Sequence, residues 1–193
     1  VSLGPDRIQK VIREGLAKGA DREIHIKTDT AGSVAPLVTA RQFTETLKAE
    51  NFDLIFSGLQ SDDVGMGQTG VIMGEMMGMS TASLVMATEI DDGKIRVKRE
   101  LEAGWFQWVS LSWPASVTIQ SGLNTPRYPS LKGIMGAKKK EITVVEPSGG
   151  EATQSLEKVY IPQSEKQTVM IEGSVDQQVE KLVDTMRNDI KVL

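Results

Sequence analysis

SGLQSDDVGMGQTG, at residues 57–70, sets the architecture expected of this chain. A short apolar run, DLIF at residues 53–56, precedes it and has the length of a buried strand. Residues 67–78 follow as a mostly apolar segment that begins and ends with glycine, which predicts a helix. A strand, a glycine-rich turn and a helix in this order form the repeating unit of α/β proteins.

The same unit precedes this stretch. Residues 1–3 read as the end of a strand, and Ile8, Val11, Ile12 and Leu16 have the spacing of one helical face, which Gly19 ends. A strand at 23–28 and a helix at 34–50 follow. Short turns between such units imply right-handed crossovers, so we predict a doubly wound, mostly parallel sheet with helices on both faces.

The pattern then changes to strands without intervening helices. Asp91-Asp92-Gly93 is a strong hairpin turn, which predicts an antiparallel extension of the α/β domain. The expected strands are residues 82–90, 94–101, 106–111 and 115–120. A short helical segment at 130–140 and a strand at 142–145 complete the expected nucleotide-binding domain, residues 1–147.

Residues 148–193 are expected to form a polar linker and a C-terminal arm, which packs either on its own domain or on a partner subunit. The arm ends in a helix at 174–193, for which Ser174 is the predicted N-cap. At the other end, Val1 opens directly on the last residues of a strand. We expect N-terminal sequence to be missing.

Composition excludes several classes of protein. The 193 residues include no cysteine, which rules out disulfides, thiolate metal sites and cysteine nucleophiles and is compatible with the cytoplasm. A net charge of -4 argues against nucleic-acid binding. No apolar run reaches the roughly 18 residues of a membrane span.

The loop at 57–70 is also the main candidate binding site. A helix that starts after a strand offers free backbone N–H groups and a positive dipole end to an anion. Glycines at 65, 67 and 70 let the backbone approach a phosphate, and Gln68 and Thr69 add side-chain donors. An ordinary glycine-rich connection is an equally good interpretation of the motif alone. The loop contains no lysine, which disfavours a P-loop phosphotransferase.

Catalytic constellations are scarce elsewhere. The single histidine, His25, lies between Ile24 and Ile26 on a predicted strand, where a surface or structural role is more common than general-base catalysis. No G-x-S-x-G elbow is present, and no spacing of carboxylates suggests a metal site. We therefore predict no catalytic residues and no metal.

A second unusual segment is YPSLKGIMGAKKK at residues 128–140. Exposed Leu131, Ile134 and Met135 beside a run of lysines would form an apolar anchor with a charged surround, which is typical of a transient docking patch. The alternative is a solvated basic helix end that covers its own carbonyl dipoles.

Four segments together resemble the beta subunit of electron transfer flavoproteins, which have an adenine-nucleotide alpha hydrolase-like fold. Residues 1–5 with 19–22 are similar to the second strand–helix unit of that family, so the resemblance implies that the family's first strand–helix unit is missing from this chain. Asp63 with residues 67–70 resembles its adenylate-binding loop. Residues 123–128 and 134–140, LNTPRY and IMGAKKK, resemble its most recognisable region.

The resemblance implies a heterodimer with an alpha subunit, on which the C-terminal arm would pack. It further implies FAD shared with that subunit, and AMP or a second FAD in the beta subunit. It also implies docking on acyl-CoA or other dehydrogenases, with a quinone oxidoreductase as a further partner, and it assigns the anchoring role to Leu131. The electron donor and acceptor stay open. The expected nucleotide contacts are Leu3, Gly4, Asp63, Gly65, Met66, Gly67, Gln68, Thr69 and Gly70.

Two other functions fit parts of the sequence. An ATP-pyrophosphatase of the related hydrolase fold is suggested by SGLQSD at 57–62, although Leu59 replaces a glycine of that family's loop. A universal-stress-type nucleotide-binding module that works as a homodimer is the other alternative. The long C-terminal arm and the Leu131 segment have no evident place in such a module.

Overall fold

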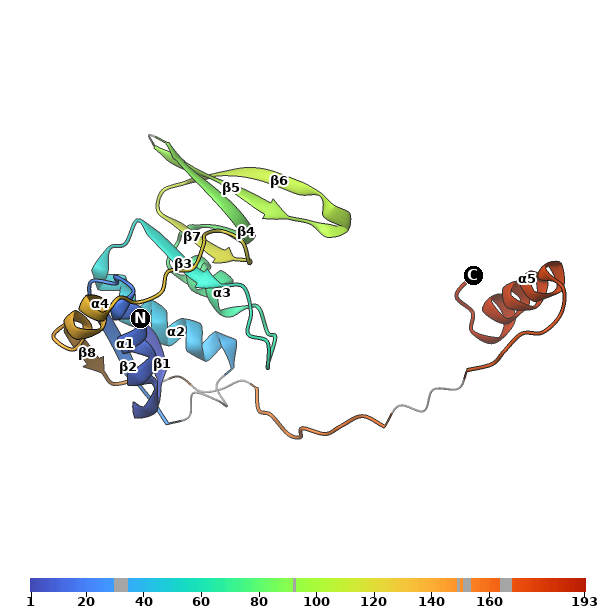
Figure 1. The fold of residues 1–193 in the computed structure, drawn as a ribbon, viewed down its shortest axis with the longest axis horizontal. Coiled ribbons are helices and arrows are strands. Elements are labelled where there is room, and N and C mark those ends of the chain that lie inside the picture. Colours follow the sequence, from blue (N-terminus) through green and yellow to red (C-terminus); the bar gives the residue numbers. More distant parts are fainter. Residues whose placement is uncertain (30–34, 92, 149, 151–153, 164–167) are drawn as a thin grey trace. The chain divides into compact units, whose positions relative to one another are not determined.

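A computed structural model describes residues 1–29, 35–91, 93–148, 150, 154–163 and 168–193 (Figure 1). It contains two compact units, Val1–Leu156 and Glu157–Leu193. The first unit carries every predicted site residue. Two residues of the predicted elements lie outside the described residues: Asp92 of the predicted hairpin turn, and Val34, the first residue of the helix predicted at 34–50.

The first strands form a parallel sheet, as predicted. β1 (Ser2–Gly4) pairs with β2 (Glu23–Lys27), and β2 pairs with β8 (Ile142–Val145), in the order β1-β2-β8. The connection from β1 to β2 contains a 3-10 turn, Asp6–Ile8, and helix α1 (Gln9–Ala17). Ile12 and Leu16 of α1 are buried, but Val11 is exposed, so the apolar face of this helix is narrower than its spacing suggested.

A second sheet has the order β3-β7-β4-β5-β6. Its strands are β3 (Leu54–Gly58), β4 (Ser80–Asp91), β5 (Lys94–Glu100), β6 (Phe106–Ser112) and β7 (Ala115–Ile119). The antiparallel extension is confirmed for β4, β5 and β6. The strand predicted at 115–120 is present as β7, but it does not belong to the antiparallel extension, because it lies parallel to β3 and β4 and between them. An inserted strand of this kind has no local sequence signal, since its neighbours are distant in the chain.

Helices cover the two faces of the first sheet, as the doubly wound prediction requires. Ile12 and Leu16 of α1 pack with Ala137 of α4 (Leu131–Ala137) and with Ile142 of β8. The opposite face packs on α2 (Pro36–Leu47). There Ile24 joins a core cluster with residues of α2, α3 (Thr69–Met76) and β3, namely Ala40, Leu47, Met73 and Ile55, and with Met79, which lies between α3 and β4. This shared cluster connects the two sheets.

The antiparallel strands β4, β5 and β6 continue the second sheet, and β4 is irregular within it. β4 changes register between Ala82 and Val85, and Leu84 within this irregular segment has a φ of 61°. A β-bulge increases the local bend and twist of a strand. Ile95 and Val97 of β5 pack in one cluster with Val117 of β7, and all three side chains are fully buried.

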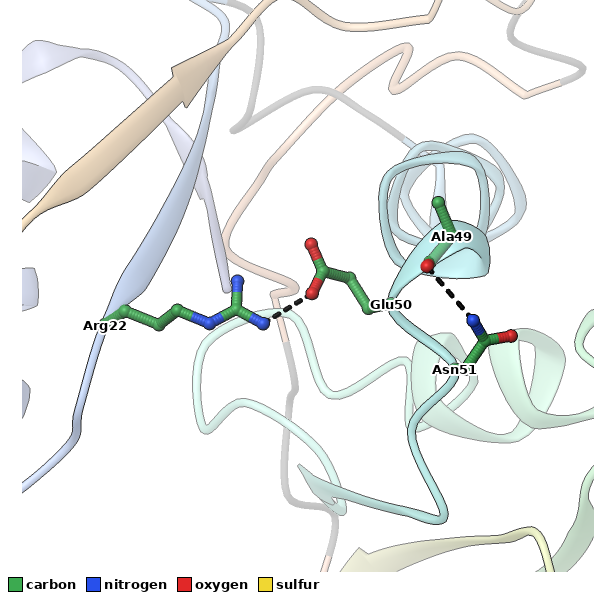
Figure 2. A network of polar contacts seen from close by, with 4 residues as sticks. All are labelled: Arg22, Ala49, Glu50 and Asn51. Carbon is green, nitrogen blue, oxygen red and sulfur yellow. Dashed lines mark hydrogen bonds and ion pairs between the residues drawn. The ribbon is translucent and has the colours of Figure 1, made fainter.

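An ion pair links the 3-10 turn that follows α2 to the residue that precedes β2. Arg22 bonds to Glu50, the last residue of the 3-10 turn Lys48–Glu50 (Figure 2). Asn51 then takes the left-handed conformation, and its Nδ2 donates to the carbonyl of Ala49 at 3.3 Å. The hydrogen bond from Arg22 lowers the pKa of Glu50. Such solvent-exposed pairs contribute little to stability.

The second unit contains α5 (Val175–Asp184) and a π-helical turn, Thr185–Asp189. Ser174 is the N-cap, as predicted, and forms a capping box with Gln177. The apolar side chains of α5, including Val175, Val179 and Leu182, are exposed.

Candidate functional site

An open cavity of about 550 Å³ lies where β3 ends and α3 begins. The loop 58–68 forms most of its wall, the first residues of α3 form another part, and the first turn of α2 contributes the rest. Its lining consists of Pro36, Thr39, Gly58, Leu59, Gln60, Ser61, Asp63, Val64, Met66, Gly67, Gln68, Thr69 and Gly70. Because β3 is a parallel strand, this is the carboxyl end at which α/β sheets bind their ligands.

Main-chain donors of α3 lie at this cavity. Gln68 is the N-cap and makes no side-chain capping bond among the described residues. The hydrogen bond from Ile72 N to Gln68 O, at 3.0 Å, begins the helical ladder. The preceding N–H groups of the first turn have no acceptor within the helix, and the helix dipole adds a partial positive charge there. This end of α3 is therefore suited to an anion.

Two glycines give the loop its path. Gly65 and Gly67 have φ values of 63° and 62°, in the left-handed region that other L-residues rarely adopt. The N–H of Gly65 donates to Ser61 O at 3.0 Å, which closes a turn before the cavity. A Cβ on Gly67 would lie 3.6 Å from Gln60 Oε1, an ordinary contact distance, so the left-handed φ is the main reason for a glycine at this position.

The side chain of Asp63 forms a hydrogen bond with the backbone of its own loop. Its Oδ1 accepts from the N–H of Val64 at 2.7 Å. A hydrogen bond from the side chain of Ser61, together with those from backbone N–H groups, lowers the pKa of the Asp63 carboxyl. The carboxylate therefore places a negative charge at the cavity wall and stabilises the turn that precedes the two glycines.

Acid titration is expected to loosen this turn. Because the pKa of Asp63 is lower in the folded than in the unfolded chain, the ionised carboxylate stabilises the fold above the unfolded-state pKa. This contribution is lost as the pH falls through the folded-state pKa. Carboxyl ¹³C NMR should give a midpoint for Asp63 below that of an ordinary aspartate, and Ser61→Ala should move it upward. A midpoint at the ordinary value in both proteins would contradict this.

Gly70 and Gly74 place α3 unusually close to the second sheet. A Cβ on Gly70 would lie 2.0 Å from Ser57 Oγ and 2.9 Å from Thr118 Cγ2. One on Gly74 would lie 2.5 Å from Thr81 Oγ1 and 2.8 Å from Ser116 Cβ. The sheet face below α3 thus carries hydroxyl groups, and the helix reaches it only because both residues lack side chains. Gly70 has a packing role whatever the cavity binds.

The structure brings most of the predicted nucleotide contacts together. Six of them line the cavity: Asp63, Met66, Gly67, Gln68, Thr69 and Gly70. Leu3, Gly4 and Gly65 are not among its lining residues. Gly4 instead accepts a hydrogen bond at 2.8 Å from Nε2 of His25, whose side chain is fully buried. His25 therefore lies in the interior of the first sheet rather than at the cavity.

Sequence reasoning missed the contribution of α2. Pro36 occupies the first helical position, where its missing N–H costs nothing, and Thr39 lies one turn later. Both line the cavity, so the starts of two helices face it. The sequence did contain a signal for this contribution: Ala35-Pro36 marks the start of a helix that follows a parallel strand, which is where such sheets bind ligands.

The predicted docking residues are grouped on α4. The exposed fractions of Leu131, Ile134 and Met135 are 80%, 43% and 67%. Ser130 caps the helix by accepting from Gly133 N at 3.0 Å. Burying side chains of this kind against another protein removes apolar surface from water.

The described part of the chain offers no group of three or more His, Cys, Asp or Glu side chains arranged to hold a metal ion. Among the helices described, none combines the length and apolar character that a membrane crossing requires.

Fold and cavity together define a doubly wound α/β protein of the class whose ligands bind at the carboxyl ends of parallel strands. Residues 1–149 match the family model of the electron transfer flavoprotein domain. The chain belongs to the electron transfer flavoprotein family, as a beta subunit.

Known beta subunits resemble it over almost its whole length. The electron transfer flavoprotein subunit beta of Methylophilus methylotrophus is 35% identical, with 99% of this chain and 76% of the relative aligned. The subunit beta of Bradyrhizobium diazoefficiens is 37% identical, over 100% of this chain and 76% of the relative. The human subunit beta is 34% identical, over 91% of this chain and 71% of the relative.

Proposed function

We propose that this beta subunit pairs with an alpha subunit, shares FAD with it, and holds an adenine nucleotide in the cavity at α3. Either AMP or the adenylate part of a second FAD would satisfy the same donors. The observation that carries the proposal is the cavity itself, where the start of α3 and the two left-handed glycines surround a space of about 550 Å³. FAD, when bound, supplies the redox chemistry.

The residues present fit an adenylate phosphate. Main-chain N–H groups at Thr69 and Gly70 would hold it, with the Gln68 and Thr69 side chains as further donors. Gly67 lines the cavity, and its left-handed conformation gives the loop the path that surrounds the group. Thr39 would approach the same ligand from α2.

A carrier role is favoured over the pyrophosphatase alternative by the residues around the cavity. Its described lining includes no Lys, Arg or His, and Asp63 is its one carboxylate. Cleavage of a nucleoside triphosphate requires groups that stabilise the negative charge that develops in the transition state, usually basic side chains or metal ions. Main-chain donors alone are sufficient to bind a nucleotide that is not cleaved.

We propose that α4 docks the subunit on electron-donating dehydrogenases, among them acyl-CoA dehydrogenases, and that a quinone oxidoreductase accepts the electrons. Leu131 would be the central anchor, because it is the most exposed of the three apolar residues on α4. A small apolar contact of this kind permits rapid release, which a shuttling carrier needs.

The deciding experiment is to co-express the chain with an alpha subunit and count FAD and AMP per heterodimer after denaturation. One FAD and one AMP, or two FAD, would support the proposal. A well-folded heterodimer with FAD but an empty beta-subunit site, even after incubation with AMP, would contradict it. Release of pyrophosphate from ATP by the purified heterodimer would favour the hydrolase instead.

Gly67→Ala is expected to weaken nucleotide binding about 5- to 30-fold. Alanine in a left-handed conformation costs roughly 1–2 kcal/mol, and the loop can escape this cost by leaving its binding conformation. Isothermal titration with AMP on the nucleotide-free heterodimer would measure the change. Gly136→Ala is the matched control, since Gly136 has no positive φ and a Cβ there meets nothing within 4 Å. Equal affinities for the two variants would argue against the loop as the binding site.

A further inference from the structure

A hollow of about 670 Å³ lies between α1 and α4, separate from the nucleotide cavity. Small residues make room for it, because Ala17 of α1 and Ala137 of α4 both line it. Tyr128, Pro129 and Ile134 add apolar surface on the side of the docking helix. Ile134 thus belongs to both the hollow and the docking patch, and the two features are continuous.

Hydrogen bonds from two basic side chains to backbone carbonyls link the C-terminal ends of α1 and α4. Arg13 of α1 donates through one nitrogen to Ala137 O at 2.5 Å and to Lys140 O at 2.7 Å, at the end of α4. Lys140 in turn donates to Leu16 O at 3.3 Å, and to Ala20 O, at the end of α1. Arg13 of α1 therefore binds carbonyls at and beyond the end of α4, and Lys140, three residues after α4, binds carbonyls at and beyond the end of α1. The hollow is preformed, so binding there needs little further ordering.

The rim of the hollow is strongly cationic. Lys10, Lys18 and Lys138 line it with Arg13, against one carboxylate, Glu14. Within the described residues, none of the three lysines takes part in an ion pair. This excess of positive charge is local, because the whole chain has a net charge of -4. An occupant with flanking carboxylates would be attracted to this face and away from most of the remaining surface.

We propose that this hollow receives an apolar side chain from an acidic segment of the dehydrogenase that docks on α4. The carboxylates of that segment would meet Lys10, Lys18 and Lys138, while its apolar side chain would contact Tyr128 and Ile134. This inference rests on the proposed docking function of α4, and it extends the docking surface onto α1. Rim charges of this type act mainly on the rate of association.

The test uses the FAD-containing heterodimer as electron acceptor for a purified acyl-CoA dehydrogenase. Lys10→Glu/Lys18→Glu is expected to raise the KM for the heterodimer about tenfold at low salt, and the difference should shrink as NaCl is added. Lys48→Glu/Lys94→Glu makes the same change in net charge at exposed positions elsewhere and should leave the KM almost unchanged. FAD content and thermal unfolding of both variants check that the fold is intact.

The outcomes separate the hollow from the docking proposal. A KM that rises with Leu131→Ala but is equal in the two double-charge variants would overturn the hollow and retain α4 docking. No effect of any variant would overturn docking and the hollow together. Carbodiimide cross-links from Lys10 or Lys18 to the dehydrogenase would support the proposal. Cross-links from these lysines to the alpha subunit in the isolated heterodimer would overturn it, because the hollow would then be an internal interface.

Discussion

Gly70→Ala is expected to lower the free energy of unfolding by about 1–3 kcal/mol or more, the usual cost of overpacking a buried site. The added Cβ would lie 2.0 Å from Ser57 Oγ, well inside van der Waals contact, so α3 would have to move away from the sheet. Such a shift also displaces the N–H groups at the cavity. We therefore expect weaker AMP binding together with the loss of stability. Urea unfolding and calorimetric titration would measure the two effects.

Adding Ser57→Ala tests whether the clash with Ser57 causes the loss of stability in Gly70→Ala. Ser57 Oγ is buried and has no hydrogen-bond partner among the described residues, so Ser57→Ala alone should be close to neutral. Added to Gly70→Ala, it removes the nearest clash and should recover a substantial part of the stability, although Thr118 Cγ2 at 2.9 Å remains. If the effects of Ser57→Ala and Gly70→Ala on the free energy of unfolding are strictly additive, the close approach of α3 to β3 is not the reason for the destabilisation.

The matched glycine control should change stability in the opposite direction. Gly15 lies within α1, has no positive φ, and a Cβ there meets nothing within 4 Å. Gly15→Ala should stabilise the protein by about 0.5–1 kcal/mol, because alanine restricts the unfolded chain and favours the helix. Similar destabilisation at both positions would show that the packing of α3 has no special effect.

Leu131→Ala is expected to lower kcat/KM for reduction by an acyl-CoA dehydrogenase about 10- to 100-fold. Fully burying a leucine side chain at an interface contributes roughly 1.5–3 kcal/mol, and central apolar anchors carry much of the binding energy. In the free subunit the side chain is 80% exposed, so its removal should leave folding and FAD content unchanged. Stopped-flow measurement of flavin reduction would give the rate.

Ile90→Ala provides the control for that experiment. Ile90 is also an aliphatic residue with high exposure, 68%, but it lies near the tip of the β4–β5 hairpin rather than on α4. Its truncation should leave kcat/KM within about twofold of the parent. Unchanged kinetics for Leu131→Ala, or an equal loss for both variants, would remove the docking role of α4.

Elements with strong local signals were predicted well. Asp53–Phe56 is almost entirely apolar and lies next to the glycine-rich loop, and the structure has β3 at Leu54–Gly58. Ser174 combines a hydroxyl with Gln177 three residues later, and the capping box is present. Both signals depend on neighbours a few residues apart, so short-range geometry is sufficient to produce them.

The candidate site was predicted in part for the same reason. Left-handed φ values at Gly65 and Gly67 follow from a tight turn, which the local sequence encodes. The wall formed by Pro36 and Thr39 depends on α2, more than twenty residues earlier, and was missed. The close contact that explains Gly70 involves Ser57 and Thr118, on strands that become neighbours only in the folded sheet.

By itself, the sequence determined the alternation of strands and helices, the helix start with its unpaired amides at the loop, and the absence of a cation within that loop. These properties arise from residues close together in the chain, where steric and hydrogen-bonding preferences act locally. Only the tertiary structure decided that β7 lies between β3 and β4, that α2 completes the cavity, and that α1 and α4 enclose a cationic hollow. Such contacts depend on which distant segments pack together, and periodicity within any one segment carries no record of its neighbours.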